Sequence, residues 1–403
     1  MKIIVYGINY SPELVGVGKY TGELVLWLGK QGHEVCVITA PPYYPNWRVW
    51  SGFSKWLYKR SVIGNLTIWR CPLFIPSRPK AALRILHLAT FALTSLPILI
   101  IQLFGGPRII LLVAPTLFCA PGVLFLTKLS RAKSILHVQD FEVDAFFGLQ
   151  LTLGGSLLKR LSLSFESFML KRFNIVSTIS TGMMQRACDK GVELGNIRFL
   201  PNWSEVTRFQ NIKPSQELMD RLGVSRNKKI ILYSGNMGEK QGLENVVLAA
   251  QHLQTTRNLV FLMVGEGASK SRLVKMVSEL NLSNVIFAPL QSNDDLPAML
   301  ASADVHLVIQ KKGVSDAVLP SKLTNILAVG GNVVITADSH TTLGKLPEEH
   351  PGLALVVEPE SVDALVGGIE KMLTMPKLNY TAQKYAQNYL DKEKILSKFF
   401  NDL

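Results

Sequence analysis

Short hydrophobic runs alternate with longer stretches of helical spacing along the first half of the chain. Six runs have the length and apolar content of buried strands: Lys2–Tyr6, Glu34–Thr39, Leu66–Arg70, Ile109–Val113, Ser134–Val138 and Ile175–Ser177. Helical patterns separate most of them, and the first helical pattern ends near Gln31. This alternation predicts an α/β fold with a parallel, doubly wound sheet, whose ligands lie beyond the carboxyl ends of the strands.

The same pattern begins again after a polar, turn-rich break at Pro201–Pro214. Strand-like runs follow at Ile230–Tyr233, Leu259–Val264 and Asn332–Thr336, with a helical pattern at Leu243–Gln254. A chain of 403 residues, of which 48% are hydrophobic, is long enough for two cores. We therefore predict two Rossmann-like domains, at residues 1–200 and 201–380, followed by a helical segment at 381–403.

The stretch Gly313–Thr336 contains the most informative helix start of the second half. Pro320 lies just outside the predicted helix, Ser321 is placed to cap it, and two glycines end it. The helix start offers free backbone N–H groups and the ammonium group of Lys322, which together attract a phosphate or diphosphate. An ordinary capped helix of an α/β domain explains the same residues equally well.

Three glycine-containing turns follow predicted strands. They contain Gly16, Val17 and Gly18; Gly235, Asn236, Lys240 and Gln241; and Gly265, Glu266 and Gly267. Glycine lets a backbone approach a ligand closely at the start of a helix. A single G-x-G turn also occurs without a ligand, and the first turn is not a Walker A loop. The second and third turns are expected to converge with the Lys322 helix at one edge of the second sheet.

Polar and acidic side chains gather where the Ser134–Val138 run ends. They are His137, Gln139, Asp140, Glu142 and Asp144. Strand ends of this kind are favoured positions for catalytic groups, which makes Asp140 a candidate. In the alternative reading, Asp140 only caps the next helix and the other acidic residues are solvated.

Charge is unevenly distributed between the two halves. Residues 1–200 hold 22 Lys and Arg against 9 Asp and Glu, whereas residues 201–403 hold 21 of each. The whole net charge of +13 therefore lies in the first half. A basic domain favours an anionic membrane surface or a phosphate-bearing substrate. Nucleic acid is the competing partner, but neither a zinc-finger nor an RNP-type signature occurs, so we expect none.

Two stretches of the first half are rich in aromatic or apolar residues. The aromatic side chains of Pro41–Trp56 suit sugar rings or lipid headgroups, or else they fill the core of their own loop. Ala89–Phe104 has no charge in sixteen residues and is interrupted by Pro97. It fits a helix in the membrane interface and a buried helix equally well, and it is short for a span of roughly 20 residues.

The cysteines argue for a reducing compartment. Cys36, Cys71, Cys119 and Cys188 lie far apart and form no C-x-x-C pair. This spacing speaks against a zinc site or a disulfide framework. The chain opens directly on a strand pattern, so we expect no signal peptide and a cytoplasmic location.

In their order, these motifs resemble those of retaining glycosyltransferases of the GT-B type, family 4, over nearly the whole chain. The similar segments are GHEVCVIT, FLPNWSEVTRF, YSGN…KQGLE, VGEG and PSKLTNILAVGGNVVI. More narrowly, KIIVYGINYSPE, TAPPYYPNW, HVQDFEVDA and SGNMGEKQGLE resemble the colanic-acid exopolysaccharide glycosyltransferases, a group associated with fucosyl transfer. The resemblance implies an acceptor-binding first domain, a nucleotide-sugar-binding second domain, and a C-terminal segment that packs back on the first domain.

The chain departs from the family pattern at the donor site. The two glutamates of the E-x7-E element fall on Ala317 and Asn325. Asn325 is still able to hydrogen-bond a donor hydroxyl, and Asp316, beside Ala317, is the candidate for the sugar contact.

The family's diphosphate-binding Arg and Lys fall on Asn236 and Gln241. Lys240 and Lys322 are then the candidate cations that stabilise the departing nucleoside diphosphate. On the first domain, Asp140 stands where the family pattern places an acceptor-side residue.

The resemblance implies transfer of a sugar, such as fucose from GDP-fucose, from a GDP- or UDP-sugar to a lipid-linked glycan, with retention at the anomeric carbon. It implies no metal and no cofactor, and the absence of an Asp-x-Asp triplet agrees with this. With the basic first half, it suggests an enzyme peripheral on the inner face of the plasma membrane. A GT-B sugar-nucleotide epimerase and a non-catalytic glycan- or membrane-binding protein are the alternatives. An epimerase needs no acceptor, and a binding protein releases no nucleoside diphosphate.

Overall fold

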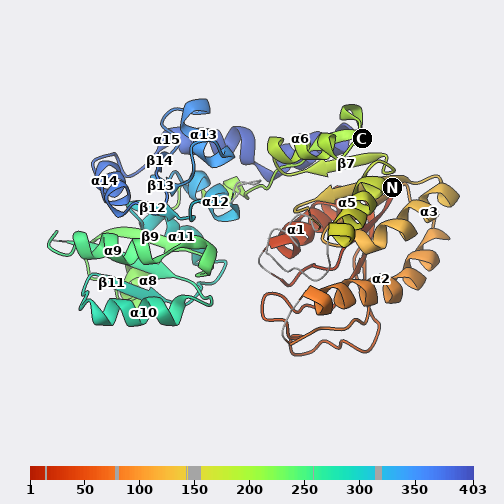
Figure 1. Ribbon diagram of the computed structural model, residues 1–403, viewed down its shortest axis with the longest axis horizontal. Helices are drawn as coiled ribbons and strands as arrows, with labels where there is room; N and C mark the ends of the chain where they lie inside the picture. Colours follow the sequence, from red (N-terminus) through yellow and green to blue (C-terminus); the bar gives the residue numbers. More distant parts are fainter. Residues whose placement is uncertain (14–15, 78–80, 142, 144–155, 257, 314–319) are drawn as a thin grey trace. The chain divides into compact units, whose positions relative to one another are not determined.

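The computed structural model describes residues 1–403 except 14–15, 78–80, 142, 144–155, 257 and 314–319 (Figure 1). The chain divides into two compact units, Met1–Leu200 and Pro201–Leu403. Each unit is built around a single sheet with helices attached. The predicted α/β fold with two doubly wound sheets is confirmed.

The described residues of the first unit form eight strands in the order β3-β4-β2-β1-β5-β6-β7-β8. They are β1 (Lys2–Tyr6), β2 (Glu34–Thr39), β3 (Lys59–Ile63), β4 (Leu66–Arg70), β5 (Ile109–Val113), β6 (Lys133–Val138), β7 (Ile175–Thr178) and β8 (Ile197–Phe199). All neighbours are parallel except β3, which pairs antiparallel with β4 at the edge. The helices are α1 (Gly16–Lys30), α2 (Ala81–Leu103), α3 (Ala120–Ser130), α5 (Ser156–Leu170) and α6 (Thr181–Asp189).

Three central strands of this sheet, β1, β2 and β5, are buried along most of their length, as expected where both faces of a sheet are covered. Every residue of β5 is buried, as are Ile3–Tyr6 of β1 and Val35–Thr39 of β2. Parallel sheets need such continuous hydrophobic runs. This is why these strands could be predicted almost to the residue.

In the second unit, the part of the chain that the structure describes forms six parallel strands in the order β11-β10-β9-β12-β13-β14. They are β9 (Lys229–Ser234), β10 (Leu259–Val264), β11 (Val285–Ala288), β12 (Val305–Val308), β13 (Val333–Thr336) and β14 (Leu355–Val357). The helices are α7 (Val206–Phe209), α8 (Gln216–Arg221), α9 (Glu244–His252), α10 (Lys270–Glu279), α11 (Leu296–Ser302), α12 (Ser321–Val329), α13 (Thr342–Glu349), α14 (Val362–Leu373), α15 (Tyr380–Tyr385) and α16 (Lys392–Asn401).

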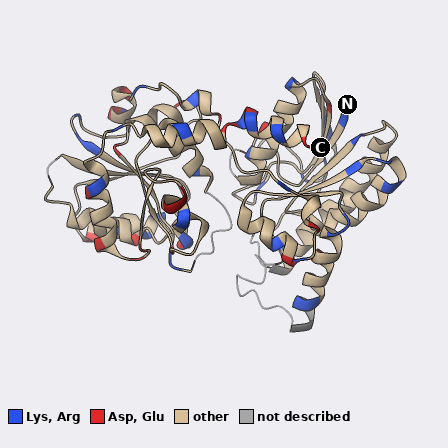
Figure 2. Ribbon diagram, turned by 90° about the horizontal axis from the view of Figure 1, so that it is seen from above, with Lys and Arg blue, Asp and Glu red and all other residues tan. Residues whose placement is uncertain are grey.

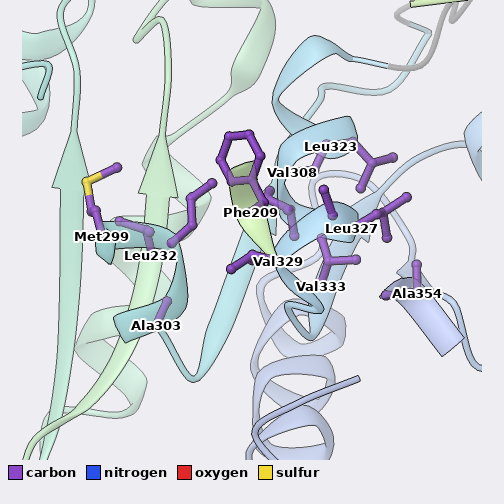
Figure 3. Close-up of a cluster of buried hydrophobic side chains, with 14 of the residues drawn as sticks. Phe209, Leu232, Met299, Ala303, Val308, Leu323, Leu327, Val329, Val333 and Ala354 are labelled. Carbon is purple, nitrogen blue, oxygen red and sulfur yellow. The ribbon is translucent and has the colours of Figure 1, made fainter. Parts of the chain in front are cut away.

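One of the cores of the second unit surrounds α12 (Figure 3). Leu323 and Leu327 of α12 are completely buried, and they join Phe209 of α7 in the same cluster. The break predicted at Pro201–Pro214 is therefore a folded part of the second unit, because Val206 and Phe209 contribute side chains to its core.

The first part of the segment after residue 380 contributes to the core of the second unit. Ala382, Ala386 and Leu390 lie in the same core as α12, and α15 packs directly on that helix. Ser204 also pairs with Asp391, since its N–H donates to the Leu390 carbonyl at 2.8 Å. Residues up to Asp391 therefore stabilise the second unit.

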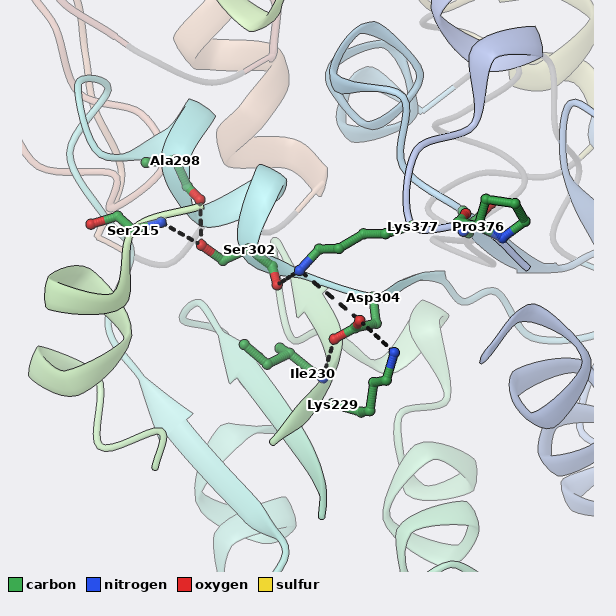
Figure 4. Close-up of polar contacts among 9 residues, drawn as sticks. Ser215, Lys229, Ile230, Ala298, Ser302, Asp304, Pro376 and Lys377 are labelled. Atoms are coloured by element: carbon green, nitrogen blue, oxygen red, sulfur yellow. Dashed lines mark hydrogen bonds and ion pairs between the residues drawn. The ribbon is translucent and has the colours of Figure 1, made fainter. Parts of the chain in front are cut away.

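A polar network joins β9, β12 and the end of α11 at the amino-terminal edge of the second sheet (Figure 4). The Asp304 carboxylate accepts a hydrogen bond from Ile230 N at 2.8 Å and lies 3.3 Å from Lys229 Nζ. Lys377 Nζ donates to the Ser302 carbonyl at 2.9 Å. Ligands of such sheets bind at the opposite edge, so this network serves the fold.

Helix α2 is longer than the predicted Ala89–Phe104, because it begins at Ala81 and continues through Pro97. One side packs on the sheet through Phe91, Ser95 and Leu99, all fully buried. The other side exposes apolar side chains, with Leu93 72% and Ile101 54% accessible. In the described part of the chain, α2 is the one helix whose length and composition would allow it to cross a membrane.

Candidate active site

Two glycine turns meet at the carboxyl edge of the second sheet. Gly235 N donates to the Val264 carbonyl at 2.9 Å, and Met237 N donates to the Glu266 carbonyl at 2.8 Å. A Cβ atom on Gly265 would lie 1.9 Å from the Gly235 oxygen, and Gly265 has a φ of +150°. Only glycine fits where two backbones approach so closely. The turns after β9 and β10 therefore form one surface.

Helix α12 begins at the same edge, but its start differs from the predicted one. Pro320 is the N-cap, Ser321 is already the first helical residue, and no side chain caps the helix. In the part of the chain that the structure describes, nothing accepts a hydrogen bond from the N–H of Ser321 or Lys322. The helix end is as predicted, since Gly330 is left-handed with a φ of 75°. These free N–H groups and the helix dipole favour an anion.

Lys322 extends from α12 to the glycine turns. Its Nζ lies 4.2 Å from the centre of the Tyr233 ring, and its side chain approaches Gly235. Tyr233 is fixed because its hydroxyl donates to the Asn236 carbonyl at 2.6 Å. Among the described residues, no carboxylate forms an ion pair with Lys322. Burial lowers the pKa of Lys322 to about 7, because the charged form loses its water.

The other predicted donor-site residues of the β9 turn have mixed environments. Asn236 and Lys240 are exposed, whereas Gln241 holds the turn because its Oε1 accepts from Gly238 N at 3.1 Å. Gln241 is thus a structural residue of the turn. Lys240 lies in the short 3-10 helix Glu239–Gln241, and its carbonyl accepts from Lys311 N at 3.1 Å.

Asn325 is less free than the sequence suggests. Its Oδ1 accepts a hydrogen bond from the Ser204 hydroxyl at 2.9 Å. That carbonyl is therefore occupied by the segment that opens the second unit, and the amide N–H₂ is the group left for a donor hydroxyl.

Two cations near these turns escaped the sequence analysis. Lys270 Nζ donates to the Gly265 carbonyl at 3.1 Å and to Glu266 Oε1 at 2.7 Å. Lys311 runs beside Gly242, where a Cβ would lie 2.8 Å from its Cγ. Neither lies in a recognisable motif, and only the spacing of four residues between Glu266, in the glycine turn, and Lys270, at the start of α10, could have indicated their pairing.

The first glycine turn opens α1 on the first unit, where Val17 separates the two glycines. Gly16 has a φ of 59° with open space around it, whereas Gly18 packs tightly against Glu13. Glu13, which the sequence analysis missed, is a buried carboxylate that accepts hydrogen bonds from Tyr43 N and Tyr44 N, each at 2.9 Å. Burial raises its pKa, and these hydrogen bonds oppose the rise. Glu13 thereby joins the turn after β1 to the loop after β2.

Asp140 lies on the surface just beyond the carboxyl end of β6. His137, at the end of that strand, is buried, and its Nδ1 lies 3.0 Å from Ser177 Oγ. Burial lowers the pKa of His137 to about 4, so its ring is neutral at pH 7. His137 supports the strand end that presents Asp140.

The remaining predicted site residues Asp316, Glu142 and Asp144 lie outside the described residues. Within the described residues, no group of three or more His, Cys, Asp and Glu side chains is arranged to hold a metal ion. The four cysteines are free, and Cys36, Cys71 and Cys119 are buried.

Two Rossmann-like units, with joined glycine turns and a lysine at the start of a helix in the second, define the class of GT-B glycosyltransferases. Residues 15–203 match the model of the glycosyl transferase 4-like domain, and residues 214–389 match that of glycosyl transferases group 1. The chain belongs to this glycosyltransferase family. It is 55% identical over 407 residues, covering 100% of both chains, to the Escherichia coli (strain K12) protein WcaI, whose name assigns it to glycosyl transfer in colanic acid biosynthesis.

Solved structures show the same fold at low identity. Sucrose-phosphate synthase from Thermosynechococcus elongatus matches with a TM-score of 0.72 and 16% identity, over 100% of this chain and 98% of that one. Anabaena Alr3699/HepE in complex with UDP-glucose matches with a TM-score of 0.68 and 14% identity, over 100% of both chains. The protein is therefore a two-domain glycosyltransferase, and the prediction of an enzyme of this class is confirmed.

Proposed function

We propose that the protein transfers a sugar, with retention at the anomeric carbon, from a nucleotide sugar to a lipid-linked oligosaccharide during synthesis of an exopolysaccharide similar to colanic acid. The observation that carries the proposal is Lys322 at the uncapped start of α12, against the joined turns at Gly235 and Gly265. The 55% identical relative named for colanic acid biosynthesis supports the pathway, and the similar HepE structure with UDP-glucose supports a nucleotide-sugar donor. Fucose from GDP-fucose is the first donor to test.

The second unit is proposed to hold the donor. The N–H groups at the start of α12 and the ammonium of Lys322 bind the diphosphate, and Lys240 adds a second cation. Negative charge grows on the nucleoside diphosphate as it leaves, so the same groups stabilise the transition state more than the ground state. Asp316 contacts the donor sugar, Asp140 of the first unit serves the acceptor, and we expect no metal ion to be required.

The first unit is proposed to attach the protein to the inner face of the plasma membrane. No Asp or Glu occurs between Glu34 and Asp140, a stretch that holds twelve Lys and Arg. Figure 2 shows Lys and Arg in blue and Asp and Glu in red. The same stretch includes α2, with its exposed apolar side, and α3, which packs beside it and exposes Phe125 and Leu129. Positive charge next to exposed apolar side chains suits an anionic membrane.

The test is nucleoside diphosphate release by purified protein with GDP-fucose, other GDP-sugars and UDP-sugars, each with and without a bacterial membrane lipid extract. We expect release with one donor only when the extract is present, and radiolabelled sugar in the lipid phase. Conversion of the free nucleotide sugar without extract would instead indicate an epimerase. Release without any labelled lipid, for every donor, would contradict the lipid-linked acceptor.

A further inference from the structure

A groove on the first unit takes no part in the proposed donor site. It has a volume of about 370 Å³ and lies between the loop that follows β2 and the segment that follows β4. Because β2 and β4 are parallel neighbours, both segments start at the carboxyl edge of the sheet. The groove is therefore on the same edge as Asp140 and the first glycine turn.

The loop that forms one wall is firmly held by its backbone. The buried Glu13 carboxylate accepts hydrogen bonds from Tyr43 N and Tyr44 N, and Trp50 N donates to the Pro42 carbonyl at 3.1 Å. At the other end, Leu73 N donates to the Lys55 carbonyl at 3.1 Å, which joins the loop to the segment after β4. The groove is thus formed before any ligand arrives, which lowers the entropy cost of binding.

Trp47 forms part of the lining with a strained backbone. Its φ is 52°, a left-handed conformation that is rare for a large side chain. Its ring is held 5.4 Å from the Tyr43 ring and 5.2 Å from the His87 ring, and Arg84 lies over it at 5.5 Å. Strain that the surrounding contacts maintain is concentrated at functional sites.

Trp56 and two cations complete the groove. The Trp56 side chain is 74% exposed, and Lys55 Nζ lies 5.0 Å from the centre of its ring. Arg48 is exposed on the same groove, and neither cation forms an ion pair with a residue that the structure describes. Indole faces pack on the apolar faces of sugar rings, while Arg and Lys bind phosphate oxygens.

We infer that this groove binds the phosphate-bearing end of the saccharide acceptor, with a sugar ring on Trp56 and the phosphate between Arg48 and Lys55. The inference rests on the proposed transfer to a lipid-linked oligosaccharide and assigns that acceptor its chemistry and its place. Three strand spacings separate β2 from β6 in the sheet order, which is roughly 14 Å. The groove therefore holds a part of the acceptor remote from the hydroxyl that reacts near Asp140, and remote contacts increase the rate with the whole acceptor.

Binding is tested by tryptophan fluorescence with glucose 1-phosphate, glucose and inorganic phosphate as probes. Glucose 1-phosphate is expected to give a saturable change in the millimolar range, at lower concentration than glucose or phosphate. Arg48→Ala and Lys55→Ala should weaken this binding roughly five- to tenfold, and high salt should weaken it further. Lys128→Ala, on α3, is the matched control and should have no effect. These side chains reach the surface, so their replacement should leave the fold intact. Equal melting temperatures of the variants and the wild type would show that weaker binding does not come from unfolding.

The second arm measures transfer to the lipid extract. Arg48→Ala and Trp56→Ala should raise the KM for the extract about tenfold and leave the Kd for GDP or UDP unchanged. Trp56→Phe should retain most activity, and glucose 1-phosphate should compete with the extract. No binding of glucose 1-phosphate, or an unchanged KM in the variants, would overturn the inference. The inference would also be overturned if anionic vesicles without glycolipid changed the tryptophan fluorescence and glucose 1-phosphate did not.

The two proposals fail differently. If the wild-type protein binds neither GDP nor UDP, the proposed donor site is wrong, although binding of glucose 1-phosphate to the groove would persist. If nucleotide binds and transfer occurs, but the groove variants behave like wild type, only the groove assignment fails.

Discussion

Lys322 has an environment that differs strongly from that of an ordinary surface lysine. It packs on the Tyr233 ring, and burial lowers its pKa to about 7. A bound diphosphate favours the charged form and restores the proton. In the free protein the ammonium group therefore holds its proton less firmly than that of a surface lysine, and we expect nucleotide binding to be coupled to proton uptake as the pH rises above neutral.

Lys322→Ala is expected to weaken GDP or UDP binding and to reduce transfer about tenfold to a hundredfold, since charged hydrogen bonds contribute roughly 1.5–3 kcal/mol.

In the wild-type protein, nucleotide affinity should fall as the pH rises from 7 to 9, by up to about tenfold per pH unit. Lys322→Arg should remove this pH dependence, because arginine stays charged. Calorimetry in buffers of different ionisation enthalpy measures the proton uptake, and a flat wild-type profile would contradict the coupling.

Asp140→Asn tests the acceptor side. If Asp140 acts on the acceptor, turnover should fall at least tenfold while nucleotide affinity stays within a factor of two. If it serves only as a helix cap, asparagine caps equally well and turnover should hardly change. The comparison of kcat with the Kd for GDP or UDP therefore separates the two roles.

His306 gives the second unit a pH-dependent stability. Burial lowers its pKa from 6.5 to about 3, so the unfolded chain binds a proton below pH 6.5 that the folded unit does not. Unfolding free energy should therefore decrease as the pH falls, by about 2 kcal/mol between pH 7 and pH 5. His306→Leu should remove this part of the slope in urea unfolding. A mutant slope equal to that of the wild type would contradict the assignment.

At the scale of elements, the sequence pattern is informative wherever a strand is buried on both sides. The bounds of Ile109–Val113 and Leu259–Val264 could be predicted to the residue, because these runs are apolar without interruption. The edge strand β3 was missed, since Lys59 and Arg60 face solvent and leave no such run. The N-cap at Pro320 was also missed, because Ser321 is as good a cap by residue type and only backbone geometry decides.

In the candidate site, too, some features could be predicted from the sequence and others could not. Glycine turns and the helix with Lys322 could be predicted, because close backbone approach restricts residue type. The partners of Glu13, Asn325 and Lys270 could not, because each pairs with a group that the loop conformation brings near rather than with one at a fixed spacing.

The end of the second unit leads to a prediction about fragments. Residues 201–403 expressed alone should fold and bind GDP or UDP. A fragment that stops at residue 380 removes the buried Ala382, Ala386 and Leu390 from the core around α12. Loss of one buried leucine typically costs about 2–5 kcal/mol, so the shorter fragment should be unfolded or bind no nucleotide. Circular dichroism and calorimetry of both fragments decide it, and a stable shorter fragment would contradict this role of α15.

At the scale of the whole molecule, the basic first half and the neutral second half suggest a division between attachment and donor binding. Twelve cations without an acidic residue surround α2 in the sequence, so the first unit should approach anionic lipid on electrostatic grounds alone. The exposed apolar side of α2 adds contacts that salt does not screen.

The protein should therefore bind anionic vesicles at low salt, leave them only partly at high salt, and leave them fully in detergent.

Leu93→Gln together with Ile101→Gln removes apolar surface from the exposed side of α2 without disturbing its buried side. This pair should weaken vesicle binding about tenfold or more, since a leucine side chain transferred from water to lipid contributes about 1.5–3 kcal/mol. Val274→Gln, an exposed change on α10 of the second unit, is the control and should have no effect. Sedimentation with vesicles of defined charge measures binding of the wild type, the α2 double variant and Val274→Gln. A fourth protein, Lys128→Ala, changes the charge of the first unit without changing α2, and it therefore probes the electrostatic contribution alone. A wild-type protein that stays in solution with anionic vesicles at low salt would refute the attachment. Equal sedimentation of the α2 variant and the wild type would leave the charge as its cause and remove α2 from the contact.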